Sequence, residues 1–215
     1  MRRFVNLIAV ALTAYSPFAA ALDKIAPAAV PAGVYQLDKS HASLLFRVNH
    51  VGFSKYTARF TRFEAQLDFD PSRLAASRVS ATVDPRSVAA DNVPSSFLEM
   101  LVSKDWLDAE SFPEMTFRSK SIEVTSPNSF RINGDLTLHG VTKPIVLEAR
   151  YNGGYASHPY EPRARIGFSA QGKFNRSDFG VTIGIPEPGT TMGVSDEVEV
   201  ILESEFSGPP LAATK

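Results

Sequence analysis

The sequence predicts a mainly β fold: an antiparallel barrel of about eight strands with one short helical insert near residues 93–108. Apolar and polar residues alternate along most of the chain, as is typical of strands with one face in water. A single stretch has helical spacing instead. Because one-sided strands must bring their apolar faces together, a closed or nearly closed barrel buries those faces and removes the sheet edges. The 215 residues, without an internal repeat, suit one domain.

Residues 1–21 have the features of a cleaved signal peptide. Arg2 and Arg3 give a positive start, an apolar stretch follows, and small residues precede a cleavage site near Ala21. The apolar stretch is shorter than the roughly 20 residues that span a bilayer, so a signal peptide is favoured over a membrane anchor. The sequence therefore predicts export to a bacterial periplasm, or secretion.

The rest of the chain divides into three parts. Residues 22–33 are rich in alanine and proline and are predicted to form a flexible lead-in. The barrel domain is predicted over 34–206, and 207–215 are predicted to be a disordered tail.

Alternation begins in "HASLLFRVNH" (41–50), where Leu44, Phe46 and Val48 share one face. In "ARFTRFEAQLDFD" (58–70) the apolar parity switches at Thr61–Arg62, which predicts a β-bulge. Five further runs alternate in the same way: "RVSATVD" (78–84), "SFRINGDLTL" (129–138), "IVLEA" (145–149), "RIGFSAQGKF" (165–174) and "EVEVILESEF" (197–206).

The insert "VPSSFLEMLVSKDWLDAESFP" (93–113) places Phe97, Met100 and Leu101 at helical spacing. Pro94 stands near its start, and the two serines that follow are candidate caps. The sequence predicts one short helix and a second turn around Trp106. Phe97 and Trp106 would form either a lid over a barrel mouth or a simple cap on the barrel end.

Composition excludes several classes of protein. The formal net charge is −1 without a basic block, so no nucleic-acid partner is expected. There is no cysteine, which excludes disulfides, thiolate catalysis and cysteine–zinc sites. The sequence lacks GxSxG, HExxH, P-loop and GxGxxG motifs. We therefore expect a protein that is not an enzyme and needs no cofactor and no metal.

Several segments carry a family resemblance. The most specific are "GDLTLHGVTKP" and "NRSDFG", and they stand in order with "DKSHASLLFRVNHVGFSKYTARF", "WLDAESFPEMTFRS" and "SDEVEVILESEF" between Tyr35 and Phe206. With these segments the chain resembles the YceI-like family of exported lipid-binding proteins. The resemblance implies an extended, lipocalin-like antiparallel barrel that holds a long apolar chain, such as a polyisoprenoid, in its interior.

Two positions and one segment depart from the family pattern. Ala42 stands where serine is usual, and Ala58 stands where glycine is common. The insert reads "PSSFLEML" where many members have arginine–aspartate before histidine–leucine. This insert lies near the barrel mouth in the family. The resemblance therefore does not imply that this chain prefers the same ligand head group as other members.

Ten residues are predicted to bind the ligand: Phe46, Val48, His50, Phe60, Phe117, Leu136, Phe168, Phe174, Arg176 and Asp178. The phenylalanines would either line a channel or fill the core, and the resemblance favours a channel for some of them. His50 shares the inward parity at a strand end, so it would either contact a ligand head or close the barrel as a satisfied histidine.

Arg176 and Asp178 continue the inward parity of Phe168 and Phe174. An unpaired inward arginine would be costly, so the two are expected to pair with each other. At the mouth, Arg176 could bind a phosphate or amide head group.

The other three histidines are expected to be structural or exposed. His41 stands at a strand start and is paired with Asp38, His139 satisfies backbone groups in a turn, and His158 lies in an exposed loop.

The sequence thus predicts an exported binding protein that holds a long isoprenoid-type lipid for transport, storage or stress protection. One alternative is a quinone-binding accessory to a membrane electron-transfer partner. A third is a hydrolase acting on a lipid or amide. A transient contact with a membrane or a membrane protein, and a homodimer, both stay open.

Overall fold

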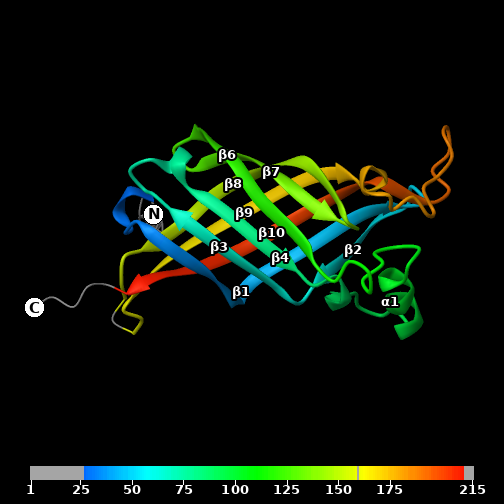
Figure 1. Ribbon diagram of the computed structural model, residues 1–215, viewed down its shortest axis with the longest axis horizontal. Coiled ribbons are helices and arrows are strands. Elements are labelled where there is room, and N and C mark those ends of the chain that lie inside the picture. The colour runs from blue at the N-terminus through cyan, green and yellow to red at the C-terminus, as the bar shows by residue number, and fades with distance from the viewer. Residues whose placement is uncertain (1–26, 159, 211–215) are drawn as a thin grey trace, which may run out of the picture.

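The computed structural model describes residues 27–158 and 160–210. They form a closed antiparallel barrel with one α-helix at one end (Figure 1). The strands are β1 (Gly33–His50), β2 (Ser54–Phe60), β3 (Phe63–Phe69), β4 (Arg78–Val83), β5 (Val88–Ala89), β6 (Met115–Ser126), β7 (Ser129–Leu138), β8 (Val141–Tyr155), β9 (Arg163–Asn175) and β10 (Val194–Pro210). The helix is α1 (Ser95–Val102), and four short 3-10 turns complete the regular structure of the described residues.

The ten strands occupy eight positions around the barrel. β3 and β2 follow one another along β1, with Gly33 opposite Phe69 and Leu44 opposite Phe60. β5 continues β4 and pairs with β2. From β6 to β10 each strand pairs with the next, and β10 pairs with β1 to close the barrel. The predicted eight-stranded antiparallel barrel with one short helix is therefore confirmed.

The predicted β-bulge at Thr61–Arg62 is wrong, because the chain leaves the sheet there. β2 ends at Phe60, and β3 begins at Phe63. The Thr61 N–H donates to the Ser87 carbonyl at 3.1 Å, and the Arg62 carbonyl accepts from a backbone N–H of the same neighbouring turn. Two residues outside the ladder change the inward parity just as a bulge would.

The helical insert is confirmed, although its predicted capping is not. α1 begins after Pro94, and no side chain caps its first turn. The serine that does bond a helix end is Ser103, whose hydroxyl donates to the Met100 carbonyl at 2.7 Å. The expected second turn is present, because the Trp106 N–H donates to the Ser103 carbonyl.

Ordered structure extends beyond both ends of the predicted barrel domain, into the predicted lead-in and tail. β10 continues to Pro210, with Ser207 opposite Gln36, so the first four residues of the predicted tail are strand. The lead-in is ordered from a 3-10 turn at Pro27–Ala29, and Val30 is only 3% exposed in the core. The apolar Val30 side chain packs in the same buried cluster as Tyr35 and Phe69. The alanine and proline content of the segment could not indicate this packing. The predicted signal peptide (1–21), residues 22–26 and 211–215 lie outside the described residues.

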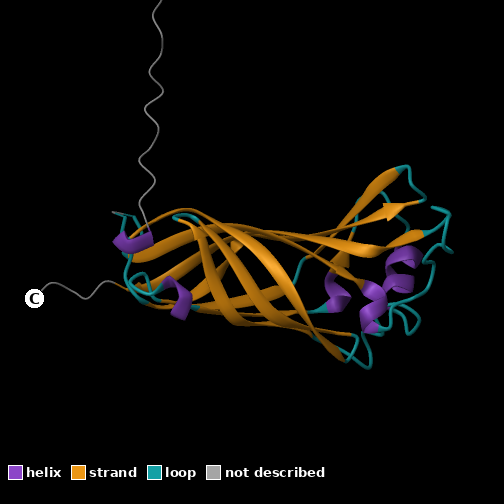
Figure 2. Cartoon of the chain, turned by 90° about the horizontal axis from the view of Figure 1, so that it is seen from above, coloured by secondary structure: helices purple, strands orange, loops and turns teal. Residues whose placement is uncertain are grey.

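The two ends of the barrel differ. The 3-10 turn at Pro27–Ala29 lies at the end where β1 begins and β10 ends, while α1 and the turns after it lie at the other end (Figures 1 and 2). Within the described residues, no helix is both long enough and apolar enough to cross a lipid bilayer.

Candidate ligand-binding cavity

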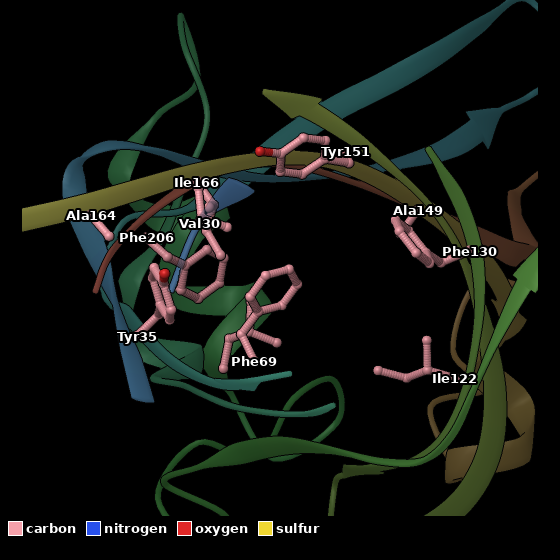
Figure 3. Packing of buried hydrophobic residues seen from close by; sticks show 11 residues of the cluster. Val30, Tyr35, Phe69, Ile122, Phe130, Ala149, Tyr151, Ala164, Ile166 and Phe206 are labelled. Atoms are coloured by element: carbon pink, nitrogen blue, oxygen red, sulfur yellow. The ribbon is translucent and has the colours of Figure 1, made fainter. Parts of the chain in front are cut away.

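The barrel encloses a cavity of about 700 Å³. Its lining extends from Phe69 and Phe206, near the end where β10 finishes, to His50 and Trp106 at the end that carries α1. The walls are the inward faces of the strands and are almost wholly apolar. Figure 3 shows Phe69 and Ile122 among the apolar side chains that point into the barrel, and both line the cavity. The volume lies within the range of roughly 300–1,000 Å³ that is usual for small-molecule sites.

One end of the cavity is closed by packed side chains. Tyr35 and Ile166 are completely buried there together with Val30. The Tyr35 ring meets the Phe69 ring edge-on at 5.8 Å, and its hydroxyl donates to the Pro31 carbonyl at 2.7 Å. This end therefore offers no path for a ligand.

Most of the predicted ligand-binding residues lie on the cavity wall. Nine of the ten line the cavity: Phe46, Val48, His50, Phe60, Phe117, Leu136, Phe168, Phe174 and Arg176. Asp178 does not; it is exposed and borders a separate polar groove with Lys143 and Lys173. The chain leaves β9 at Asn175 and turns, so the inward parity does not reach Asp178. Contact of the nine wall residues with a ligand stays a prediction.

The phenylalanines pack against other side chains of the core and also line the cavity. The Phe46 and Phe60 rings stack at 5.3 Å on neighbouring strands. Phe168 meets three other aromatic rings, including Phe206 at 6.4 Å, and still lines the cavity. Gly134 makes room for Phe117, because a Cβ at Gly134 would lie 2.4 Å from the Phe117 ring. Stacked rings that keep each other in place can bound a space without filling it.

The mouth lies between α1 and the loops on the opposite side. Phe97, Met100 and Trp106 line the cavity from the insert. His50, Ser54 and Val194 line it from the other side. The insert therefore covers the barrel end from one side only. His50 is exposed there at the rim of the cavity, and both of its predicted roles stay predictions.

Arg176 is the one buried charged side chain in the part of the chain that the structure describes, and its predicted pairing with Asp178 is wrong. Among the described residues no carboxylate forms an ion pair with it; its guanidinium donates instead to four backbone carbonyls. They belong to Val181, Ile183, Val194 and Ser195, at 2.8–3.0 Å. The guanidinium also lies 5.5 Å from the centre of the Trp106 ring, a cation–π distance.

These contacts give Arg176 a structural role. Four of its five N–H groups are already used, so little capacity remains for a phosphate or amide head group. Burial lowers the pKa of the Arg176 guanidinium, and the nearby Asp196 carboxylate opposes that change. Arg176 ties the loop after β9 to the start of β10 and thereby shapes the mouth.

Tyr56 is a wall residue that the sequence analysis did not single out. Its ring meets the Phe97 ring edge-on at 5.9 Å, and its hydroxyl is buried without a hydrogen-bond partner in the described structure. Burial raises the pKa of this hydroxyl, with a smaller contribution from Asp91. Tyr56 stands two and four residues before Ala58 and Phe60 on the same strand. This spacing was the sign in the sequence that Tyr56 faces inward. In an apolar cavity, this hydroxyl is a donor that a ligand could use.

We expect Tyr56→Phe to stabilise the ligand-free protein by about 1 kcal/mol, because an unpaired buried hydroxyl is costly. Urea unfolding of the ligand-free protein measures this. Thr57→Ala, on the outer face of the same strand, is the control and should change the free energy of unfolding by less than about 0.5 kcal/mol. A clear loss of stability in Tyr56→Phe would show that the hydroxyl has a partner.

The outer surface near the closed end carries a polar cluster around Arg165. His41 bonds to Asp38 at 2.8 Å, as predicted. The Asp38, His41 and Glu205 side chains lie close enough to hold a metal ion. However, the Arg165 guanidinium donates to both carboxylates, at 2.5 Å and 2.7 Å. The positive charge of Arg165 thus already neutralises the two carboxylates, and the cluster connects β1, β9 and β10.

We expect an NMR titration to place the pKa of His41 above the usual value. The hydrogen bond to Asp38 and the charges of Asp38 and Glu205 raise the pKa of His41, while Arg165 opposes them. Because the raised pKa belongs to the folded state, this pairing stabilises the fold below the unfolded pKa, and the stabilisation is lost as pH rises through the folded pKa. Asp38→Asn should lower the pKa of His41; an unchanged titration would contradict the pairing.

The remaining histidines agree with their predictions. His139 lies in the β7–β8 turn with a positive φ of 52°, and its Nδ1 is 3.1 Å from the Phe179 carbonyl. His158 is exposed in the β8–β9 loop.

Comparisons with known proteins agree with this architecture. The model of the YceI-like domain family matches residues 35–206. The YceI protein of Salmonella arizonae is 34% identical over 177 residues, which cover 81% of this chain and 86% of that protein. The crystal structure of BcnA from Burkholderia cenocepacia superposes with a TM-score of 0.67 at 24% identity, covering 79% of this chain and 98% of BcnA. A polyisoprenoid-binding domain from Saccharophagus degradans superposes with a TM-score of 0.59 at 13% identity, covering 81% and 98% of the two chains.

Proposed function

The chain belongs to the YceI-like family, and on that premise we propose that it is a binding protein that encloses one long, apolar, isoprenoid-type lipid. The observation that carries this proposal is the apolar cavity of about 700 Å³, closed at one end and bordered by α1 at the other. The polyisoprenoid-binding domain from Saccharophagus degradans, which shares the fold, supports the same class of ligand.

Affinity would come from burial of the apolar chain. Each methylene that moves from water into the cavity contributes about 0.8 kcal/mol, so a long chain needs few polar contacts. Specificity would then depend on cavity length and on the polar groups at the mouth, His50 and the Tyr56 hydroxyl. No bond is made or broken in this mechanism, and the ligand leaves unchanged.

The Tyr56 hydroxyl favours a second candidate, an isoprenoid quinone carried for a membrane electron-transfer partner. A quinone carbonyl accepts a hydrogen bond, and the Tyr56 hydroxyl is a buried donor without a partner on the cavity wall. A hydrocarbon chain without such a group would leave the hydroxyl unsatisfied.

The deciding experiment is mass spectrometry of an organic extract from protein purified natively from its own organism. One prenyl lipid per chain supports the carrier proposal, and an isoprenoid quinone with its characteristic absorbance selects the second candidate. A protein that emerges empty, and that takes up neither ligand from detergent solution, would refute both.

We also propose that the protein works in the periplasm. The support is the sequence of residues 1–21, with a cleavage site near Ala21. N-terminal sequencing of protein from a periplasmic extract should begin at or near Leu22. A cytoplasmic protein that keeps Met1 would refute this location.

A further inference from the structure

We propose that the mouth of the barrel docks on a lipid bilayer, and that Phe53 and Met192 are the side chains that enter the membrane. This inference rests on the proposed function, since it names the surface from which the barrel takes its ligand. The site of docking is formed by two rim loops, residues 51–53 between β1 and β2 and residues 182–193 before β10.

The two rim loops expose large apolar side chains at neighbouring points. Phe53 is 87% exposed and Met192 is 72% exposed. The loops are joined, because the Val51 N–H donates to the Gly193 carbonyl at 2.8 Å. Gly52 packs against Thr191 so closely that a Cβ there would lie 2.9 Å from the threonine hydroxyl. The two apolar side chains are therefore carried on one connected structure.

The backbone of the hairpin tip is held in an unusual conformation. Val51 has a φ of 47°, and β-branched residues rarely adopt the left-handed region. The Phe53 N–H donates to the His50 carbonyl at 2.9 Å and closes the turn. A strained turn that leaves an aromatic side chain in water points to a use for that side chain.

The rim loops border the cavity mouth directly. His50 and Ser54, which flank the hairpin tip, line the cavity, and so does Val194, which follows the second loop. Both loops extend at the α1 end of the barrel, on the side away from α1 (Figure 1). Because the opposite end is closed by Tyr35 and Ile166, an apolar chain would pass this rim when it enters.

The chemistry of the rim fits a bilayer better than a protein. Phe53 and Met192 are only two protruding side chains, whereas a stable protein interface buries about 800 Å² on each partner. Residues 182–193 carry one charged residue, Glu187, and residues 51–53 carry none. Isolated apolar side chains with little charge enter the acyl boundary of a membrane reversibly, as a carrier that must leave again requires.

The test uses phosphatidylcholine vesicles without any added ligand. We expect the wild-type protein to cosediment with the vesicles, and the double variant Phe53→Asp/Met192→Asp to partition about tenfold more weakly or worse. Because the rim is nearly uncharged, high salt should not release the wild-type protein. The matched control is Tyr160→Asp, which replaces an aromatic residue that is 93% exposed in the β8–β9 loop at the closed end, and it should bind like wild type.

A second measurement follows transfer of a fluorescent polyprenyl lipid from the same vesicles to the protein. The double variant should take up the lipid about tenfold more slowly from vesicles, while its uptake from detergent solution should match wild type. Since the vesicle-binding assay contains no prenyl lipid, it can succeed even if the proposed function fails. Uptake of the prenyl lipid from detergent can in turn succeed even if docking fails.

Three results would overturn the docking proposal. The wild-type protein could fail to bind vesicles, or the double variant could bind as well as wild type. Sedimentation could also show a dimer that the double variant abolishes, in which case a second copy of the chain covers the rim. Both side chains are exposed, so the variants should keep the wild-type melting temperature, and Phe53→Leu/Met192→Leu should keep vesicle binding.

Discussion

Ala170→Trp is expected to abolish lipid uptake while the barrel stays folded. Ala170 lines the cavity between Ala149 on β8 and Leu202 on β10. The two alanine side chains are small and leave room that an indole ring would occupy. Displacing several methylenes at about 0.8 kcal/mol each should weaken binding by roughly 100-fold or more. Stability should hold or rise, because the ring fills empty apolar space.

The measurement is equilibrium binding of a fluorescent prenyl lipid, with thermal unfolding as the test of folding. Gln171→Trp is the matched control, since it adds the same ring at the next position, on the exposed outer face. It should bind like wild type. Unchanged affinity in a folded Ala170→Trp protein would mean that the ligand does not occupy the barrel interior.

Arg176→Ala should lower the free energy of unfolding by about 3–5 kcal/mol, which is typical when the partner of buried polar groups is removed. The substitution leaves the carbonyls of Val181, Ile183 and Val194 without a donor and removes the contact with Trp106. Arg176→Lys should recover only part of the loss, because an ammonium group lacks the planar set of five donors. Urea unfolding measures all three proteins.

The control is Arg131→Ala, which removes an exposed arginine whose partners are Glu123 and Glu148 on the surface. Surface pairs of this kind contribute at most about 1 kcal/mol. Arg176→Ala could instead change the free energy of unfolding as little as Arg131→Ala and abolish ligand binding. In that case Arg176 would bind a head group, which is the role the sequence indicates. A large loss of stability would establish the structural role.

The alternation of residues was enough to predict which side chains face inward wherever a strand runs without interruption. Phe46 and Phe168 are examples, and both line the cavity. β6 was not recognised from alternation, because Ser119 faces the interior and accepts a hydrogen bond from the Val79 N–H. A register shift between Ser119 and Ser121 then moves Ile122 onto the inward face. A polar residue on the inward face, followed by a register shift, interrupts the alternation of apolar and polar residues by which a strand is recognised.

The role of Arg176 could not be predicted for a different reason. The inward parity of β9 suggested that the strand continues, but the chain turns at Arg176–Phe179 and ends the turn at Gly180 with a φ of 82°. The partners of the guanidinium are backbone carbonyls of later residues. Every residue has a backbone carbonyl, so the sequence does not indicate which ones will accept. Gly180 was the one available sign that the strand stops.

The closure of the barrel by β1 and β10 has a consequence for folding. Leu44 pairs with Leu202, so the last contact of the barrel joins segments from opposite ends of the described chain. Such a high contact order predicts slow folding, roughly milliseconds to seconds or longer. Until β10 arrives, β1 and β9 are open edges that can pair with other chains. We therefore expect the unfinished barrel to be the form most exposed to aggregation, and chains truncated before β10 to aggregate rather than fold.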